Sequence, residues 1–376
     1  GRCGWNTSFL ERSVFIRLVH KVRKKKFHSI YIGSCTVNLF GMARIVKSEN
    51  FLLSLHRFLF KEMKRLVIIL TLCVSAIFAI AQTLERIPFG DFESWTTREI
   101  KESGIIGGKT KLLYVVGPEA YIKGNKPYDY KAHTPWTMSN AYAKVAGIHK
   151  GSNTVQPEER DGGRCARLDT KMEDVTVLGF IDISVLVSGS MFLGQTLEPI
   201  TGTGDPYKNL NFGMPFTRKP KALVLDYKCI ISKNNYVMKF PGVGSKRIDG
   251  VQDKAEFFVY LQKRWEDEEG NIHALRVGTA REQLDHDVPE WVNGHRVEIH
   301  YGDITQTDYY QDFMHLNGPY RAMNSKGKIV PVIEEGWGTA DDTPTHVIMM
   351  ITAGNQGAFI GTVGNTLWVD NVCWAF

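Results

Sequence analysis

The chain has 376 residues, 43% of them hydrophobic, and is therefore long enough to bury one large core or two ordinary ones. Its formal net charge of +6 is unevenly distributed, because residues 1–81 contain 14 Lys and Arg against 3 Asp and Glu. Residues 82–376 are left with 32 basic and 37 acidic residues, so the charge pattern gives no indication of a nucleic-acid-binding surface.

The first 62 residues differ in character from the rest of the chain. They begin with Gly rather than Met and contain a basic run from Lys21 to Lys26. Their apolar patch, Phe51 to Phe60, is shorter than the ~20 residues that a membrane-spanning helix needs. We interpret residues 1–62 as an over-extended upstream region that is disordered and has no function of its own.

A secretion signal is predicted for residues 63–81. Residues 63–65 (MKR) supply a start and a positive region, and residues 66–78 (LVIILTLCVSAIF) form a compact apolar segment. Ala79-Ile80-Ala81 is an A-x-A cleavage site, so we expect export to the periplasm or cell surface with cleavage after Ala81. A membrane anchor is the alternative, but it requires about 18 or more apolar residues and this run is shorter.

The remaining chain begins with short strands and a long irregular region. Residues 87–95 (IPFGDFESW) place Gly-Asp before a short aromatic strand, and residues 112–116 (LLYVV) form a second apolar run. Proline and glycine recur throughout residues 117–165 and break any helical period. We therefore expect this region to be mostly loop.

Strands continue through the middle of the chain. Residues 163–170 are predicted to be a strand that leads to a longer one at 175–187, and residues 189–220 are predicted to be mostly loop. Residues 221–231 (KALVLDYKCII) alternate apolar and polar side chains, which indicates a half-buried antiparallel strand.

The second half repeats this alternation. Residues 255–263 and 295–301 alternate in the same way, and a turn at 266–271 connects the first of them to a strand at 272–277. Helical character is predicted only for two short segments, 279–284 and 308–315.

The chain ends in a strand that is predicted to belong to the core. Residues 346–352 are an almost unbroken apolar run, and residues 353–365 contain four glycines that indicate turns. Residues 367–374 then alternate with a period of two and are rich in β-branched and aromatic side chains. With fourteen Tyr, eight Trp and 35 Gly, the sequence predicts an all-β protein, an antiparallel β-sandwich built as a single domain over residues 82–376.

Several segments together resemble a known family. They are PWTMSN (135–140), GGRCARLDT (162–170), GMPFTRKPKALVLDYKC (213–229), DKAEFFVYLQKRWED (253–267) and HVIMMITAGNQGAFIGTVGNTLWVDNV (346–372). They are similar to the PCMD family, the putative carbohydrate metabolism domain of exported Bacteroidetes proteins, over nearly all of residues 85–376. The resemblance implies a jelly-roll β-sandwich like that of carbohydrate-binding modules and a role in glycan use at the cell envelope.

The resemblance also suggests a structural Ca²⁺. Gly90-Asp91-Phe92-Glu93 at the first strand and residues 367–372 at the last resemble the terminal signatures of carbohydrate-binding jelly rolls, in which these two strands are neighbours. Glu93 and Asp370 would supply charged oxygen ligands to the ion, with backbone carbonyls near Gly90. The alternative is that both carboxylates cap strand ends or pair with Lys and Arg. No organic cofactor is expected.

Enzymatic function is the alternative to binding. Hydrolysis of a glycosidic bond needs two carboxylates across a cleft, one of them with a raised pKa. The candidates are Glu334, Glu335, Asp341 and Asp342, together with Asp285 and Asp287. Adjacent acidic residues in loops are more often solvated surface. Motifs for serine hydrolases, zinc peptidases, P-loop enzymes and dithiol redox proteins are absent from the sequence.

We therefore predict an exported glycan-binding protein, with a glycoside hydrolase and an envelope structural component as alternatives. The expected partner is an oligosaccharide or polysaccharide, and other envelope proteins are further candidate partners. Aromatic rings in loops are the natural platforms for the C–H faces of sugars. The candidates are Trp337, Trp291, Tyr309 and Tyr310. Cys165, Cys229 and Cys373 are interpreted as small buried hydrophobic residues.

Overall fold

The computed structural model describes residues 60–64, 83–177, 181–202 and 204–376. The predicted upstream region and signal peptide therefore lie almost entirely outside the described residues. Residues 60–64 are helical, and residues 82–376 form a compact unit of their own. In the part of the chain that the structure describes, no helix has the length and apolar character needed to cross a bilayer.

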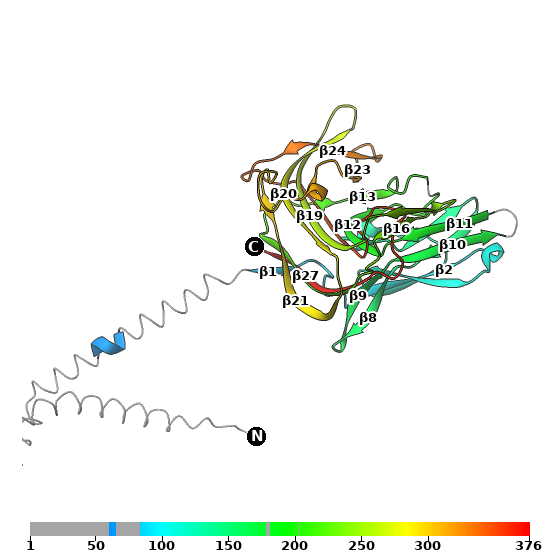
Figure 1. Ribbon diagram of the computed structural model, residues 1–376, viewed down its shortest axis with the longest axis horizontal. Coiled ribbons are helices and arrows are strands. Elements are labelled where there is room, and N and C mark those ends of the chain that lie inside the picture. The colour runs from blue at the N-terminus through cyan, green and yellow to red at the C-terminus, as the bar shows by residue number, and fades with distance from the viewer. Residues whose placement is uncertain (1–59, 65–82, 178–180, 203) are drawn as a thin grey trace, which may run out of the picture. The chain divides into compact units, whose positions relative to one another are not determined.

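Two large sheets dominate the described residues of this unit (Figure 1). The smaller one is antiparallel and has six strands. In spatial order it consists of β21 (Val288–Glu298), β15 (Ala222–Ile230), β27 (Thr366–Ala375), β9 (Gly163–Asp169) and β8 (Val155–Arg160), with β1 (Leu84–Arg86) also paired to β27.

The larger sheet has ten strands, and its long strands β19 and β20 are strongly curved (Figure 1). Its main path is β13 (Leu210–Phe212), β12 (Ser190–Thr196), β25 (His346–Thr352), β19 (Ala255–Glu266), β20 (Ile272–Leu284), β24 (Ile329–Trp337) and β23 (Arg321–Met323). Three short strands join it at the side: β5 (Trp136–Met138), β14 (Met214–Pro215) and β22 (His300–Tyr301). The pair β20–β24 is parallel, whereas β19 is antiparallel to both of its neighbours.

Smaller sheets and short helices complete the unit. The three-stranded sheets are β3 (Thr110–Val116) with β2 (Trp95–Lys101) and β4 (Ala120–Lys123), β10 (Lys171–Val177) with β11 (Ile181–Val187) and β17 (Pro241–Gly242), and β18 (Lys246–Asp249) with β16 (Tyr236–Lys239) and β26 (Ile360–Gly361). A hairpin is formed by β6 (Ala141–Val145) and β7 (Ile148–Ser152). The helical turns are α4 (Tyr130–His133), η1 (Gly104–Ile106) and η2 (Asp312–Met314).

The main core lies between the inner faces of the two large sheets. Leu223 and Leu225 of β15 face inward from the smaller sheet, and Phe257, Val259 and Leu261 of β19 face inward from the larger one. Each set is spaced two residues apart, because successive side chains of a strand point to opposite faces. The prediction of an all-β sandwich is confirmed.

The C-terminal strand β27 is central to the smaller sheet. It pairs with β15 on one side and with β9 and β1 on the other, so the first and last strands of the unit are neighbours. The first strand is β1, however, and not the strand expected within residues 87–95, where residues 88–91 form a turn and β2 begins only at Trp95. Gly90 makes this approach possible, since a Cβ at this position would lie 2.6 Å from the carbonyl oxygen of Val372. The predicted strand at the end of the chain is thus confirmed as part of the core.

Other predicted elements were wrong. Residues 117–165, expected to be mostly loop, contain β4 to β8 and α4, and the single strand expected over residues 175–187 is divided between β10 and β11. Residues 279–284, expected to be helical, belong to β20, because their backbone pairs with β19 through residues 255–260. Of the helix expected at residues 308–315, only the turn η2 is present.

Candidate ligand-binding site

A pocket of about 850 Å³ lies on the outer face of the ten-stranded sheet. Its lining comes from β12, β13, β14, β19, β20, β23 and β25, together with α4 and the turn that follows β23. In β19, Gln262, Arg264 and Glu266 alternate with the residues that face the main core, so these three side chains point outward. The volume is within the range of roughly 300–1,000 Å³ that is typical of small-molecule sites.

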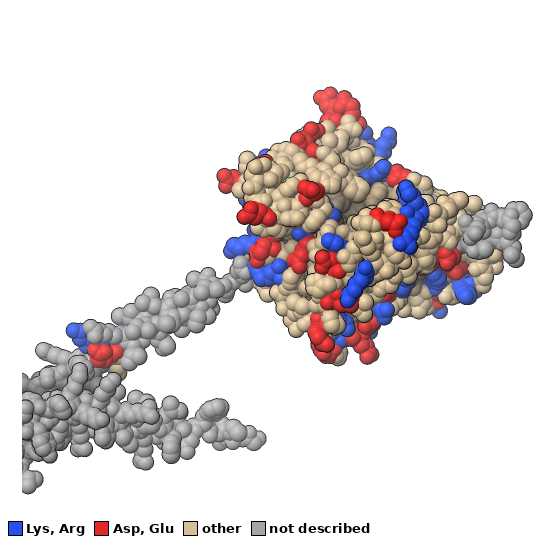
Figure 2. Space-filling view, viewed as in Figure 1, with Lys and Arg blue, Asp and Glu red and all other residues tan. Residues whose placement is uncertain are grey.

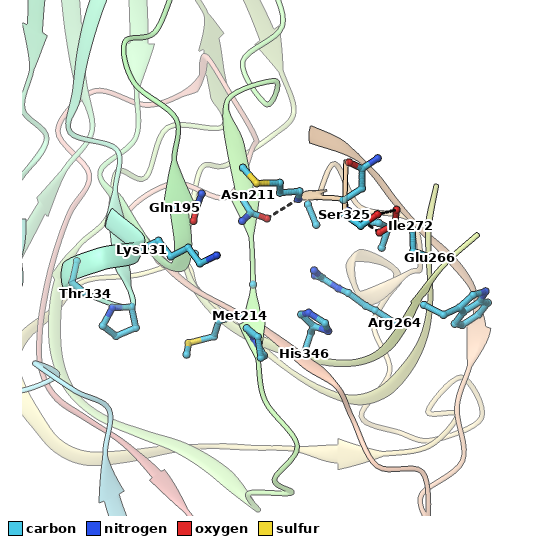
Figure 3. Close-up of a pocket in the computed structure, with 18 of the residues that line it drawn as sticks. Lys131, Thr134, Gln195, Asn211, Met214, Arg264, Glu266, Ile272, Ser325 and His346 are labelled. Carbon is cyan, nitrogen blue, oxygen red and sulfur yellow. Dashed lines mark hydrogen bonds between the residues drawn. The ribbon is translucent and has the colours of Figure 1, made fainter. Parts of the chain in front are cut away.

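Arg264 extends from β19 toward the middle of the pocket (Figure 3). Its Nε donates a hydrogen bond to Oε1 of Gln262 at 2.8 Å, and Nη1 donates to the carbonyl oxygen of Phe212 at 3.1 Å. Nη2 is buried and has no hydrogen-bond partner among the described residues. One nitrogen of this guanidinium, with both of its N–H donors, is therefore left unsatisfied among the described residues.

Gly213 permits this position of the Arg264 guanidinium. Its φ of +86° is favourable for glycine, and a Cβ at this residue would lie 3.0 Å from Nη2 of Arg264 and 2.8 Å from the carbonyl oxygen of Val347. A larger residue at position 213 would therefore push against the guanidinium and the neighbouring strand.

Arg264 also lacks a carboxylate partner. Three other largely buried arginines each have one, in the pairs Arg98–Glu198, Arg276–Glu334 and Arg281–Glu256. No aspartate or glutamate of the described residues forms an ion pair with Arg264. Burial lowers the pKa of Arg264 to about 10, so the side chain still carries its charge at neutral pH. The pocket thus contains a cation that no carboxylate of the described residues pairs with directly, although the charge of Glu334 acts to raise its pKa.

Two other polar side chains of the pocket, His346 and Asn211, have hydrogen-bond partners within the protein. Nδ1 of His346 lies 2.9 Å from Oγ1 of Thr345, and burial together with the charge of Arg264 lowers the pKa of His346 to about 4. His346 is therefore neutral at pH 7. Oδ1 of Asn211 accepts a hydrogen bond from the backbone N–H of Met323 at 2.8 Å.

Two further polar side chains reach the pocket without a partner. The amide of Gln195 and the ammonium of Lys131 make no side-chain hydrogen bond with a described residue, and Lys131 reaches in from α4 on the side opposite Arg264 (Figure 3). Glu266 supplies the one carboxylate among the described residues that line the pocket, and Ser325 occupies its oxygens through N–H and Oγ at 2.8 and 2.7 Å.

The pocket therefore combines apolar walls with free polar groups. Met214, Ile272 and Pro135 contribute apolar surface, which suits the C–H faces of a sugar ring. Glu266 is the one carboxylate among the described lining residues, whereas the usual mechanism of glycoside hydrolysis uses two. A polar ligand with apolar faces is what this geometry accommodates.

Comparison with known proteins agrees with a role in carbohydrate metabolism. The model of the PCMD family, described as a putative carbohydrate metabolism domain, matches residues 109–374. The chain belongs to the PCMD family. A search of curated proteins gave no match.

Two solved structures show weaker similarity. One, described as a putative glycoside hydrolase from Bacteroides thetaiotaomicron VPI-5482, has a TM-score of 0.40 and 18% identity, covering 78% of this chain and 71% of that chain. Another, described in the same words and from Bacteroides vulgatus ATCC 8482, has a TM-score of 0.35 and 13% identity, covering 77% of this chain and 95% of that chain. At this level of similarity, neither structure assigns an activity to the PCMD chain.

None of the four aromatic residues predicted to bind sugar lines the pocket of the PCMD chain. Trp337 is half-buried, with the guanidinium of Arg276 5.5 Å from its ring centre. The ring of Trp291 carries the guanidinium of Arg160 at 3.8 Å, which occupies one of its faces.

The two predicted tyrosines lie close to η2. The hydroxyl of Tyr309 accepts a hydrogen bond from the backbone N–H of Arg281, and its ring stacks on His300 at 3.7 Å. Tyr310, half-buried, forms a turn with Thr307 through its backbone. The structure therefore does not bring the predicted aromatic residues together into one platform.

Two of the predicted catalytic carboxylates, Glu334 and Asp342, have pKa values below the usual range. Burial acts to raise the pKa of Glu334, but hydrogen bonds from Arg276 and Gln262 outweigh it and hold the pKa below its usual value. Hydrogen bonds from Lys263 and Thr339 lower the pKa of Asp342 to about 2. A general acid needs a raised pKa, so neither carboxylate is suited to that role.

Among the other acidic candidates, three have a histidine or backbone partner and one is exposed to solvent. Glu335 contacts Nδ1 of His273 at 2.6 Å, and Asp341 is exposed. Asp285 contacts Nδ1 of His286 at 2.8 Å, which lowers the pKa of Asp285, and Asp287 accepts a hydrogen bond from the backbone N–H of Ile231.

The two carboxylates proposed for calcium are held by different groups. Glu93 accepts hydrogen bonds from the backbone N–H of Arg164 at 3.2 Å, whereas Asp370 accepts from Nη1 of Arg160 at 2.7 Å. Within the described residues, no group of three or more His, Cys, Asp or Glu could hold a metal ion. Asp370 is thus paired with the Arg160 guanidinium, whereas Glu93 is held by a backbone N–H, and two carboxylates engaged in this way do not supply the six to eight oxygen ligands that Ca²⁺ takes.

The pocket residues themselves were not singled out from the sequence. Arg264 lies one residue beyond the predicted strand 255–263, and its position in the sequence gives no sign that it lacks a partner. The one available signal is the alternation along β19, which places Gln262 and Arg264 on the outer face. The segments that pack around that face, and so form the pocket, are set by the sheet topology and are not visible from the alternation alone.

Proposed function

We propose that the PCMD chain is an exported glycan-binding protein that takes part in carbohydrate capture or metabolism at the cell envelope, and that the pocket beside Arg264 is its saccharide site. The observation that supports this most directly is the combination of apolar walls with unpartnered polar groups in a pocket of about 850 Å³. Sugars present both C–H faces and hydroxyl groups, so they need both kinds of surface.

Binding without hydrolysis is favoured over the enzymatic alternative. Glu266 is the one acidic side chain among the described residues of the pocket, and its oxygens are occupied by Ser325. A role as an envelope structural component is the other alternative, and it would not require a pocket of this size.

The visible surface carries charges of both signs, without a large area of one sign. Figure 2 shows Lys and Arg interspersed with Asp and Glu on the face in view, with uncharged areas between them. Long-range attraction of a polyanion such as nucleic acid is therefore not expected from this face. Recognition depends instead on the groups within the pocket.

A glycan array of the purified protein, followed by titration calorimetry of the best ligand, tests this function. Met323→Trp would fill part of the pocket without removing a side-chain hydrogen bond, and should weaken binding strongly. Ile333→Trp on β24 is the matched control, because Ile333 is 40% exposed and lies outside the pocket. Release of reducing sugar ends during incubation would support a hydrolase, and the absence of any glycan binding would favour a structural role.

A further inference from the structure

The free groups of the pocket are mainly hydrogen-bond donors. Arg264 and Lys131 are donors only, and the oxygen of Asn211 is already used by the backbone of Met323, which leaves its NH₂ group to donate. The one carboxylate of the lining, on Glu266, is engaged by Ser325. The charged free groups are therefore donors only, and the ligand has to supply acceptors to them, whereas the amide of Gln195 can either donate or accept.

We infer that the pocket selects saccharides carrying an acidic sugar residue, whose carboxylate or sulfate is bound by Arg264 with Lys131 on the opposite side. This inference rests on the proposed glycan-binding function and adds the chemical class of the ligand. A carboxylate or sulfate has only acceptor oxygens, and a guanidinium presents paired donors in a planar fork that matches them.

The charge of the pocket also favours an anionic ligand. Arg264 has no carboxylate partner among the described residues, in contrast to Arg98, Arg276 and Arg281. A buried cation without a counter-ion is costly, and a bound anion would remove that cost. A neutral sugar would not, because its hydroxyl groups carry no charge.

His346 is suited to stand beside this anion. Its ring is neutral at pH 7, because burial and the charge of Arg264 lower its pKa to about 4, so Nε2 is able to donate or accept a hydrogen bond according to its tautomer. Nη2 of Arg264 packs closely against the backbone at Gly213, where a Cβ would lie 3.0 Å from it, so this glycine is required for the position of the guanidinium.

The test compares three disaccharides that differ in the groups at C6: digalacturonate, digalactose and a 6-O-sulfated digalactose. Calorimetric titration of the purified protein should give at least about tenfold tighter binding of an acidic disaccharide than of digalactose, the scale expected for a charge-assisted hydrogen bond. Preference for digalacturonate would identify a uronic acid site, and preference for the sulfated sugar would identify a sulfate site.

Variants locate the effect. Arg264→Gln should remove the preference for acidic sugars, so that the acidic disaccharide and digalactose bind with similar affinity, and Arg264→Lys should restore the preference only in part, because an ammonium lacks the fork. Lys131→Gln is the second variant, since Lys131 is exposed and its loss does not threaten folding. Lys131→Gln should lower the affinity for acidic sugars a few-fold. Arg247→Gln on β18 removes the same charge outside the pocket and should change nothing.

The outcomes separate the two proposals. Equal affinity for the acidic and neutral disaccharides, or an acidic preference that survives Arg264→Gln in a folded variant, would overturn the inference and leave glycan binding intact. A protein that binds none of the three disaccharides and no glycan on the array would overturn both. Thermal melting of each variant shows whether a loss of binding reflects unfolding.

Discussion

Asp226 and Asp370 lie directly opposite each other on the neighbouring strands β15 and β27, and Nη1 of Arg160 donates hydrogen bonds to both, at 2.9 and 2.7 Å. Like charges in this position destabilise a sheet, so the shared arginine is what makes the pair tolerable. Asp226 also accepts from the backbone N–H of Gly294 at 2.7 Å. The three ionic side chains are about one-tenth exposed.

Arg160→Gln should therefore destabilise the protein by about 3 kcal/mol at pH 8, because two buried carboxylates lose their counter-ion. The loss should be smaller at pH 5, since burial already raises the pKa of Asp370 to about 6 and allows it to take up a proton. Urea unfolding at both pH values measures this difference. Adding Asp226→Asn should recover part of the stability, and the exposed Arg164→Gln should change it by no more than about 0.5 kcal/mol.

A second prediction concerns Asp253, which is fully buried and precedes β19 by two residues. Burial raises its pKa to about 7, although its oxygens accept hydrogen bonds from the backbone N–H of Thr362 and Asn355 at 2.8 and 3.1 Å. Between the unfolded pKa of 3.8 and pH 7 the native state binds the extra proton, so this residue's contribution to stability falls as pH rises.

The change between pH 4 and 7 should be roughly 2–4 kcal/mol. His346 acts in the opposite direction, since its lowered pKa makes it lose stability as pH falls below 6.5. The comparison is therefore between the native protein and Asp253→Asn, measured by urea unfolding at pH 5, 6, 7 and 8. In Asp253→Asn, the decrease in the free energy of unfolding that Asp253 causes as pH rises should be absent. A native stability that varies with pH in the same way as that of Asp253→Asn would show that Asp253 is ionised throughout.

The sequence predicts the strands that obey a simple alternation and misses those that do not. Residues 221–231 and 346–352 were predicted correctly because each is bounded by turn residues and carries a clear apolar pattern. The hairpin β6–β7 turns at Ala146-Gly147, and β8–β9 turns at Asp161-Gly162, where all four residues have positive φ. Asp-Gly is a known signal of a two-residue hairpin, so the second of these was within reach of sequence analysis.

The rest depends on tertiary structure. Residues 279–284 (TAREQL) favour helix by composition, and pairing with β19 overrides this preference. The pocket draws on α4, β12, β13, β19 and β25, which are up to about two hundred residues apart, so its existence follows from the topology. That Arg264 lacks a carboxylate partner is likewise visible only when its neighbours are known.

A third prediction separates a structural role of Trp337 from a role in binding. The Arg276 guanidinium lies 5.5 Å from the Trp337 ring centre, and this contact is worth about 1–2 kcal/mol when desolvated. Trp337→Ala should lower stability by about that amount in thermal melting, and leave sugar affinity at the pocket unchanged, because Trp337 is not part of its lining. Trp337→Phe should retain more of the stability. If neither property changes in Trp337→Ala, the side chain has neither role.

A fourth prediction concerns export. Cleavage after Ala81 should leave a mature chain that starts at Gln82, the first residue of the compact unit. Intact-mass measurement of periplasmic or surface material checks this directly. Recovery of a chain that retains Met63 would show that the apolar segment is kept as an anchor.

The last prediction concerns calcium at the junction of the first and last strands. A Ca²⁺ that bound only the folded state would raise the melting midpoint with the logarithm of its concentration. Asp370 already accepts from Arg160, and Glu93 accepts from the backbone of Arg164, so an ion would have to displace an arginine that also holds Asp226. We therefore expect the midpoint after EDTA treatment to be unchanged by added calcium. A logarithmic rise that Asp370→Asn abolishes would instead establish the site, and the same rise in both proteins would place calcium elsewhere.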